Sequence, residues 1–209
     1  MPSPDVASAK ESRISWRGEL ARKSIHLCSL VIPLAFYILN QKVIIIGLSA
    51  AFIFMATFDL LRLFGNITVK KYFRWLFGFM LRPRERKSFS GATTILFAAL
   101  LVYIFYDLRI AAASMVIIVM GDTAAAFIGR LIGRVRLINN KTIEGTTAFI
   151  IASLVGLFFI PKLGFQLGLI GALVGALFEV LPIPIDDNVT VPLLAGAAMQ
   201  LMVSYQLFI

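Results

Sequence analysis

Seven apolar stretches follow one another along this chain, and each is about as long as a helix that crosses a lipid bilayer. We place them at residues 24–39, 42–61, 92–106, 108–132, 143–160, 163–181 and 190–209. A helix needs roughly 20 mainly apolar residues to span the hydrocarbon core, where the backbone must satisfy its own hydrogen bonds. The sequence therefore predicts an all-α, polytopic membrane helix bundle of about seven transmembrane helices.

The composition agrees with a membrane protein. Hydrophobic residues make up 59% of the 209 residues, charged residues 15%, and the mean hydropathy is +0.90, whereas soluble domains carry about 25% charged residues. We expect a single transmembrane catalytic domain over residues 24–209, with no room for a separate soluble domain. A polar arm over residues 1–23 precedes it without a small-residue cleavage site, which argues against a signal peptide.

Lysine and arginine are distributed unequally between the two sides of this arrangement. Seventeen lie in the arm and in the connections 62–87 and 130–141, and three lie in short turns on the other side, at Lys42, Arg109 and Lys162. Because cytosolic loops carry an excess of Lys and Arg, we expect a cytosolic N-terminus and cytosolic arm, with the C-terminus outside. The net charge of +9 is thus first a topology signal, and we expect no nucleic-acid partner.

The connection after the second stretch contains a segment of a different kind. Residues 66–82 are rich in aromatic side chains and carry Lys70, Lys71 and Arg74 close together. A helix in the interface plane would place such aromatic side chains among lipids and leave the cations to headgroups. We predict an interfacial amphipathic helix here, either as a simple anchor or as a guide for a lipid substrate.

Acidic residues gather on the predicted cytosolic side, which the rule for Lys and Arg does not explain. Ten of the eleven lie there, and Asp59, Asp122 and Glu179 are the deepest within apolar stretches. An ionised carboxylate near the middle of a membrane costs on the order of 3 kcal/mol, so such residues are candidate functional residues. Interleaved with Arg and Lys, they indicate a polar cavity for a divalent cation and a polyphosphate.

A set of polar motifs extends over most of the chain. They are Glu19-x-x-Arg22-Lys23-x-x-His26, Asp59-x-x-Arg62, Arg84-Glu85 followed by Ser90-Gly91-x-Thr93, Gly121-Asp122-x-x-Ala125 with Gly129 and Gly133, Lys141-Thr142-x-Glu144-Gly145, and finally Glu179 and Asp187-Asn188 with Pro192. Together they resemble the motifs of the CTP-dependent polyprenol and lipid kinases, a family that includes dolichol kinase, phytol kinase and the CTP-dependent diacylglycerol kinase.

The resemblance implies phosphoryl transfer from CTP to the hydroxyl of an isoprenoid lipid alcohol at the cytosolic face of the bilayer. Whether the chain forms an oligomer stays open. It implies Mg²⁺, or another divalent cation, on Asp122, Glu144 and Asp187, with Lys141 and His26 as further catalytic residues. The residues expected to bind CTP are Arg22, Ser90, Gly91, Gly121, Arg130, Lys141, Thr142, Gly145 and Asn188. Backbone N–H groups at Ser90-Gly91, or at the helix start within 141–145, are expected to cradle phosphate.

Two other functions stay open at the level of sequence. Membrane cytidylyltransferases share motifs like those around Gly121-Asp122 and Lys141-Thr142, although their basic segment and P-G-H-G-G run are missing here. A lipid transporter or scramblase is the second alternative. Alternating access would call for polar residues in both halves of the membrane, whereas the acids of this chain are predicted on one side.

Overall fold

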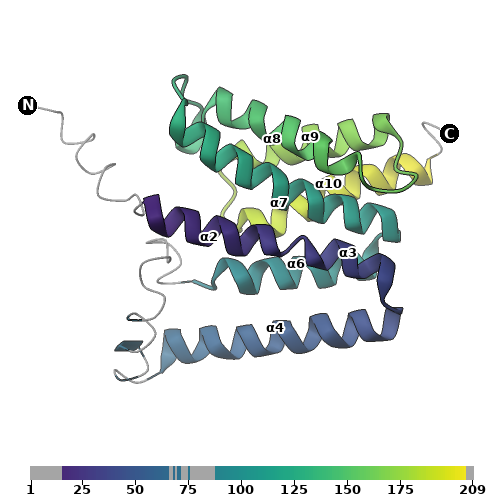
Figure 1. Cartoon of the computed structure of the whole chain (residues 1–209). Coiled ribbons are helices and arrows are strands. Elements are labelled where there is room, and N and C mark those ends of the chain that lie inside the picture. Colours follow the sequence, from purple (N-terminus) through teal and green to yellow (C-terminus); the bar gives the residue numbers. More distant parts are fainter. Residues whose placement is uncertain (1–15, 66–67, 69, 72–74, 76–87, 206–209) are drawn as a thin grey trace, which may run out of the picture.

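The computed structural model of the chain describes residues 16–65, 68, 70, 71, 75 and 88–205, and Figure 1 shows how they are arranged. These residues form α2 (Trp16–Cys28), α3 (Val31–Ile38), α4 (Gln41–Phe64), α6 (Gly91–Phe105), α7 (Leu108–Leu131), the 3-10 helix η2 (Ile138–Asn140), α8 (Ile143–Leu157), α9 (Phe165–Val180) and α10 (Asp187–Ser204). The all-α fold class is confirmed for this part of the chain.

Helix α7 forms the centre of the bundle. It contacts α2, α3, α6, α8, α9 and α10, and every residue from 110 to 119 is buried. A helix that is apolar on all sides is expected in such a position. Helix α4 lies at the opposite extreme, at the edge of the bundle beside α6 (Figure 1).

Small residues bring α7 and α8 close together. A Cβ atom added at Gly121 would lie 2.7 Å from the ring of Phe149 and from Oγ of Ser153, and one at Gly129 would lie 3.0 Å from Oγ1 of Thr142. Close approach of this kind is how helices associate in a membrane. Gly121, expected from the sequence to bind CTP, therefore has a packing role in the interface between α7 and α8.

The first membrane helix is divided in two near its middle. Helix α2 ends at Cys28 and α3 begins at Val31, and in between the N–H of Ile32 bonds to the carbonyl of Ser29 at 2.9 Å. Pro33 has no N–H to give to the carbonyl four residues back, which interrupts the regular helical pattern. Helix α2 begins at Trp16, so residues 16–23, expected to belong to the arm, are helical, because one face packs on α7.

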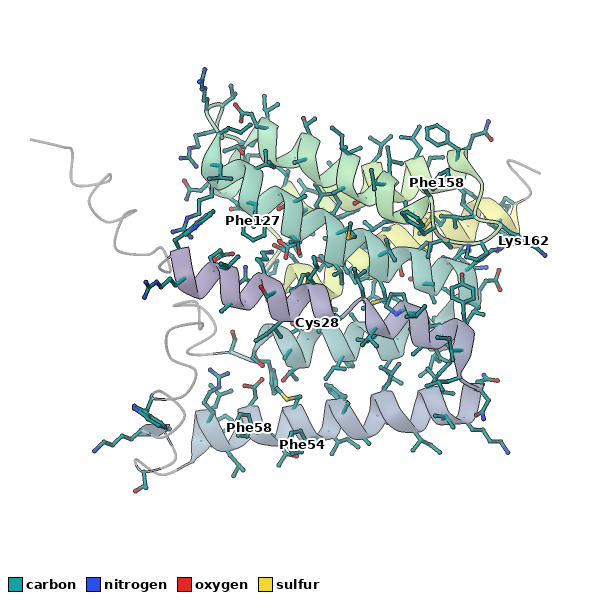
Figure 2. All side chains as sticks on the ribbon, viewed as in Figure 1. Cys28, Phe54, Phe58, Phe127, Phe158 and Lys162 are labelled. Carbon is teal, nitrogen blue, oxygen red and sulfur yellow. The ribbon has the colours of Figure 1, made fainter. Side chains whose placement is uncertain are left out.

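Among the residues that the structure describes, three helical segments are long and apolar enough to cross a membrane: Trp16–Ile38, Gln41–Phe64 and Leu108–Leu131. Helices α6, α8 and α9 are apolar but shorter. Large apolar side chains cover the outside, as Phe54 and Phe158 illustrate at 70% and 86% exposure (Figure 2). Such a surface suits lipid better than water. The number of spans remains a prediction.

The two ends of the bundle can be located by labelled residues. Lys162 lies at the end opposite Phe127 (Figure 2), and Phe127 lies near the C-terminal end of α7. The predicted interfacial helix over residues 66–82 falls outside the described residues except at positions 68, 70, 71 and 75. Polar residues of the predicted motifs, among them Asp122 and Lys141, lie toward the Phe127 end.

Candidate active site

The candidate site lies at one end of the helix bundle (Figure 1). The starts of α2, α6, α8 and α10 and the ends of α7 and α9 are all at the same end of the bundle (Figure 1). This arrangement follows from the antiparallel order of the helices. It brings residues far apart in the sequence, from α2 to α10, to one polar end.

Asp122 projects from α7 toward α2. Its carboxylate forms an ion pair with Lys23 through Oδ2, and Nε2 of His26 lies 3.6 Å from the same oxygen. Nζ of Lys23 also donates to the main-chain carbonyl of Asp122 at 2.9 Å. Lys23 is fully buried, while the Asp122 side chain keeps 13% exposure. One face of α2 thus holds the deepest acid of α7.

Lys141 connects two further acids. Its ammonium forms an ion pair with Glu179 of α9 and lies 3.5 Å from Oδ2 of Asp187 at the start of α10. Burial alone would lower the pKa of Lys141, but the carboxylates of Glu179, Asp187 and Asp122 outweigh that cost and raise the pKa above its usual value. Lys141 is therefore a firmly charged cation at the centre of the site.

Glu144 is occupied by the loop that precedes α8. Its Oε1 accepts the N–H groups of Arg134 at 3.0 Å and Val135 at 3.3 Å. The loop turns back at Asn139 and Asn140, both with φ of 58°, a conformation that Asn tolerates better than most residues. Glu144 was expected to bind metal, and here it organises the loop that carries Lys141.

Three N–H groups from the two alternative phosphate cradles, those of Ser90, Ile143 and Gly145, have partners within the protein. The N–H of Gly145 donates to Oγ1 of Thr142 at 3.1 Å, and the N–H of Ile143 donates to the carbonyl of Val135 at 3.0 Å. At the other candidate, the N–H of Ser90 donates to Asp59 at 2.7 Å. Thr142, Gly145 and Ser90 are thus engaged in helix capping and packing. Gly91 is the first residue of α6.

Asp59 belongs to a separate cluster that joins α4 to the start of α6. Its Oδ1 faces Arg62 at 2.8 Å, and its Oδ2 accepts hydrogen bonds from the hydroxyls of Ser90 at 2.8 Å and Thr93 at 2.6 Å. Arg62 in turn donates to the carbonyl of Ser88 at 2.6 Å. Asp59 is completely buried. We define Asp59, Arg62, Ser88, Ser90 and Thr93 as the α4–α6 staple.

Asn188 lies in a network between α10 and α6. Its amide donates to Oγ1 of Thr94 at 3.2 Å, and its N–H donates to Oδ1 of Asp186 at 3.0 Å. The Thr94 hydroxyl also donates to Asp186 at 3.1 Å. Asp187 and Asn188 form the first turn of α10, so this network fixes the helix start that presents Asp187 to Lys141.

The two arginines expected to contact phosphate have partners within the protein. Arg22 lies 2.7 Å from Oε1 of Glu19 on the same helix. The guanidinium of Arg130 stacks over the ring of Trp16, 4.9 Å from its centre, and Trp16 also packs edge-on against Phe127. Both arginines nevertheless lie at the site end of α2 and α7.

The donors that the structure places together limit how a metal ion could be held. Within the described ranges, no three His, Cys, Asp or Glu side chains form a group that could hold a metal ion. Oε2 of Glu179 is buried without a hydrogen-bond partner, beside Lys141. Mg²⁺ in phosphoryl-transfer sites is commonly held by one or two carboxylates plus substrate phosphates. The donors fit that arrangement better than a cage made of three protein carboxylates.

Sequence reasoning assigned no individual role to three residues that shape the site: Lys23, Trp16 and Thr94. Lys23 could have been found, because Glu19, Lys23 and His26 share one helix face at spacings of four and three residues, and all three are buried. Trp16 fell in the predicted arm, where no packing was expected. Thr94 gave no signal, since a hydroxyl in an apolar helix is common.

Comparisons with known proteins cover most of the chain. A CTP-dependent diacylglycerol kinase 1 of Eremothecium gossypii is 23% identical over 216 residues, which covers 90% of this chain and 68% of that protein. The protein of the same description from Saccharomyces cerevisiae is 25% identical over 214 residues, covering 88% of this chain and 73% of its own length.

A bacterial relative has a similar length. An uncharacterized protein of Rickettsia prowazekii is 24% identical over 190 residues, covering 84% of this chain and 90% of its own. No protein-family model matches the chain, and no solved structure matches it significantly. Similarity over 84–90% of the chain sets the frame for the function.

Proposed function

We propose that this protein, a member of the CTP-dependent lipid kinase family by its homology to two fungal CTP-dependent diacylglycerol kinases, transfers the γ-phosphoryl group of CTP to the hydroxyl of a membrane lipid. The observation that carries the proposal is the cluster of Asp122, Lys141, Glu179 and Asp187 at one end of an apolar bundle. Acids and buried cations in such surroundings are costly unless they serve binding or chemistry.

Phosphoryl transfer makes few covalent demands on a protein. It needs in-line positioning of donor and acceptor, and positive charge around the transferred group. Lys141 is the central phosphate ligand in our proposal, with Arg22 and Arg130 as outer cations. Asp122 and Asp187 would hold Mg²⁺ that arrives with the nucleotide. When bound, this ion would neutralise charge on the phosphates.

The reaction balances as follows. A bond forms between the lipid hydroxyl oxygen and the γ-phosphorus, and the bond from that phosphorus to the β,γ-bridging oxygen breaks, which releases CDP. The hydroxyl proton passes to a base. His26 is our candidate, because its Nε2 lies 3.6 Å from Oδ2 of Asp122, and a carboxylate stabilises an imidazole that gains a proton.

The identity of the lipid that accepts the phosphoryl group is a separate question. The sequence motifs led us to expect an isoprenoid alcohol, whereas the names of the two fungal relatives favour diacylglycerol. Both lipids present a primary hydroxyl at the membrane surface, which suits a site at the end of the helices. We propose diacylglycerol as the preferred acceptor, to be tested against an isoprenoid alcohol.

The proposal includes the orientation of the protein in the membrane. The cation distribution predicts that the end carrying Lys141 and Asp122 faces the cytosol, where CTP is available. A seven-span topology with a cytosolic N-terminus accounts for this placement. Cysteines introduced at Arg136 and Lys162 would then be labelled from opposite sides of the membrane.

Transfer of label decides the reaction. The purified protein is incubated with γ-labelled or α-labelled CTP and vesicles that contain diacylglycerol, a polyprenol or phosphatidate, the last as the acceptor for a cytidylyltransferase. We expect γ-label in the lipid, release of CDP, and faster labelling of diacylglycerol. Entry of α-label into lipid with release of pyrophosphate would instead identify a cytidylyltransferase. Absence of both labels from the lipid would favour a transporter.

A further inference from the structure

Lys23 is the most deeply buried ionisable side chain of the candidate site and has no role in the reaction described above. Its relative exposure is 0%. It holds two groups of the same residue, since its ammonium pairs with the carboxylate of Asp122 and donates to the Asp122 carbonyl at 2.9 Å. An interaction with both the side chain and the main chain of one acid fixes the position of that acid closely.

The energetics of Asp122 require such a partner. An ionised carboxylate in an apolar helix bundle is strongly unfavourable without a cation next to it. In the arrangement of this structure Lys23 supplies that charge, and both side-chain contacts of the Asp122 carboxylate with α2 use Oδ2. A divalent cation on the same carboxylate would bring a second positive charge to a position close to the ammonium.

We propose that Lys23 is a positioning residue that acts as the resident cation of Asp122 and yields this carboxylate only when a divalent cation arrives together with nucleotide. The proposal rests on the proposed function. It follows that Asp122 binds Mg²⁺ poorly before the nucleotide is present, because the ion must displace a buried ammonium. With phosphates present, Lys23 gains new negative charge nearby, and the exchange no longer leaves a buried cation unpaired.

The packing of α2 permits the exchange. Helix α2 is separated from α3 by the irregular turn at Ser29 and Leu30, and α7 is its principal contact. The polar contacts of α2 with α7 include Lys23 and His26 with Asp122, together with the stacking of Trp16 on Arg130. The helix is thus held on α7 partly by the residues proposed to receive the metal ion and the phosphates.

Thermal unfolding of the purified protein, with no lipid substrate, tests this role. The wild type, Lys23→Met, and the double variant Lys23→Met with Asp122→Asn are compared in 10 mM MgCl₂ or in NaCl of equal ionic strength. We expect no Mg²⁺-specific shift for the wild type. Lys23→Met should be stabilised by Mg²⁺, since a ligand at ten times its Kd favours the folded state about elevenfold. The double variant should lose that response.

Lys42→Met is the matched control, because Lys42 is exposed at the start of α4 and lies outside the site. It should behave as the wild type. A Mg²⁺-specific shift in the wild type that Asp122→Asn removes would overturn the proposal, as would equal responses of Lys23→Met and the double variant. If Lys23→Met yields no folded protein, the wild type alone decides: a Mg²⁺-specific shift is expected only when a non-hydrolysable CTP analogue is also present, and the same shift with Mg²⁺ alone, or no shift with both, contradicts the proposal. Label transfer by the wild type tests the kinase proposal separately.

Discussion

Asp59 and Asp122 are both acids within apolar helices, but the structure surrounds them differently. Asp59 is enclosed by the α4–α6 staple, in which a guanidinium, two hydroxyls and a backbone N–H satisfy both of its oxygens. Asp122 relies on Lys23 and a histidine at 3.6 Å, and its side chain remains 13% exposed. A carboxylate with fixed, complete partners stabilises the fold, whereas one held by an exchangeable cation remains able to bind a ligand.

The matched changes Asp59→Asn and Asp122→Asn are the strongest test of this difference between a structural and a ligand-binding carboxylate. We expect Asp122→Asn to lower kcat per folded molecule about a hundredfold to a thousandfold, because it removes charge that supports phosphoryl transfer. Asp59→Asn should keep kcat within about threefold and instead lower the free energy of unfolding by roughly 3 kcal/mol, since Arg62 then lacks its buried partner.

The readouts are turnover corrected for the folded fraction and thermal or denaturant unfolding in the same detergent. Asp122→Asn also leaves Lys23 buried without its acid, so we expect lower stability that the added change Lys23→Met relieves while turnover stays low. If Asp59→Asn lost activity as severely as Asp122→Asn, the distinction between staple and site would fail.

A smaller effect is expected at Lys141. Lys141→Met should lower the free energy of unfolding by about 2 kcal/mol at pH 7, because buried Glu179 loses a cation that is itself partly exposed. The raised pKa of Lys141 sets the pH dependence. The stabilisation is fully present below the unfolded pKa of about 10.4 and is lost as the pH rises through the higher folded pKa.

Unfolding curves of the wild type and Lys141→Met between pH 7 and 11 measure this dependence. Their difference should stay constant to about pH 10 and shrink above it. A difference that already closes near pH 8 would mean that the lysine is deprotonated easily, against the idea of a firmly charged phosphate ligand. Lys162→Met at the opposite end of the bundle serves as the control.

The smallest effect concerns Glu144. Because the amide oxygen of Gln can still accept the N–H groups of Arg134 and Val135, Glu144→Gln should keep kcat and the Mg²⁺ requirement within about threefold of the wild type. Glu144→Ala should disturb the loop and raise KM for CTP. Equal, severe losses of kcat for both variants would indicate that Glu144 binds the metal ion.

The sequence predicted the helices well because each apolar stretch carries its own length signal. Helices α4, α6, α7, α8, α9 and α10 each correspond to one predicted stretch. The exception is α2, which begins at Trp16 although the predicted stretch begins at residue 24. Its buried residues Gly18, Glu19 and Lys23 fell in the predicted polar arm, and packing against α7, including the contact with Asp122, makes that face an interior one.

The site was harder to derive, because motifs identify residues but not their partners. Glu144 and Asp122 stand in equally suggestive motifs, but one accepts two N–H groups of a neighbouring loop and the other faces α2. The choice of Lys23 rather than Arg22 as the partner of Asp122 depends on the rotation of α2 against α7. Spacing places Lys23 with Glu19 and His26 on one face of α2, but packing between helices fixes which neighbour that face meets.

The α4–α6 staple also has a consequence for handling the protein outside a membrane. Helix α4 buries Ile44, Leu48, Asp59 and Arg62. Polar contacts therefore provide much of the packing of its C-terminal end against the bundle. Hydrogen bonds between helices are strongest where water cannot compete, and an unsatisfied partner costs most in hydrocarbon. Detergent micelles that admit water weaken these polar contacts and leave the apolar packing around α7 intact. The choice of solubilising amphiphile therefore acts on α4 before it acts on the rest of the bundle.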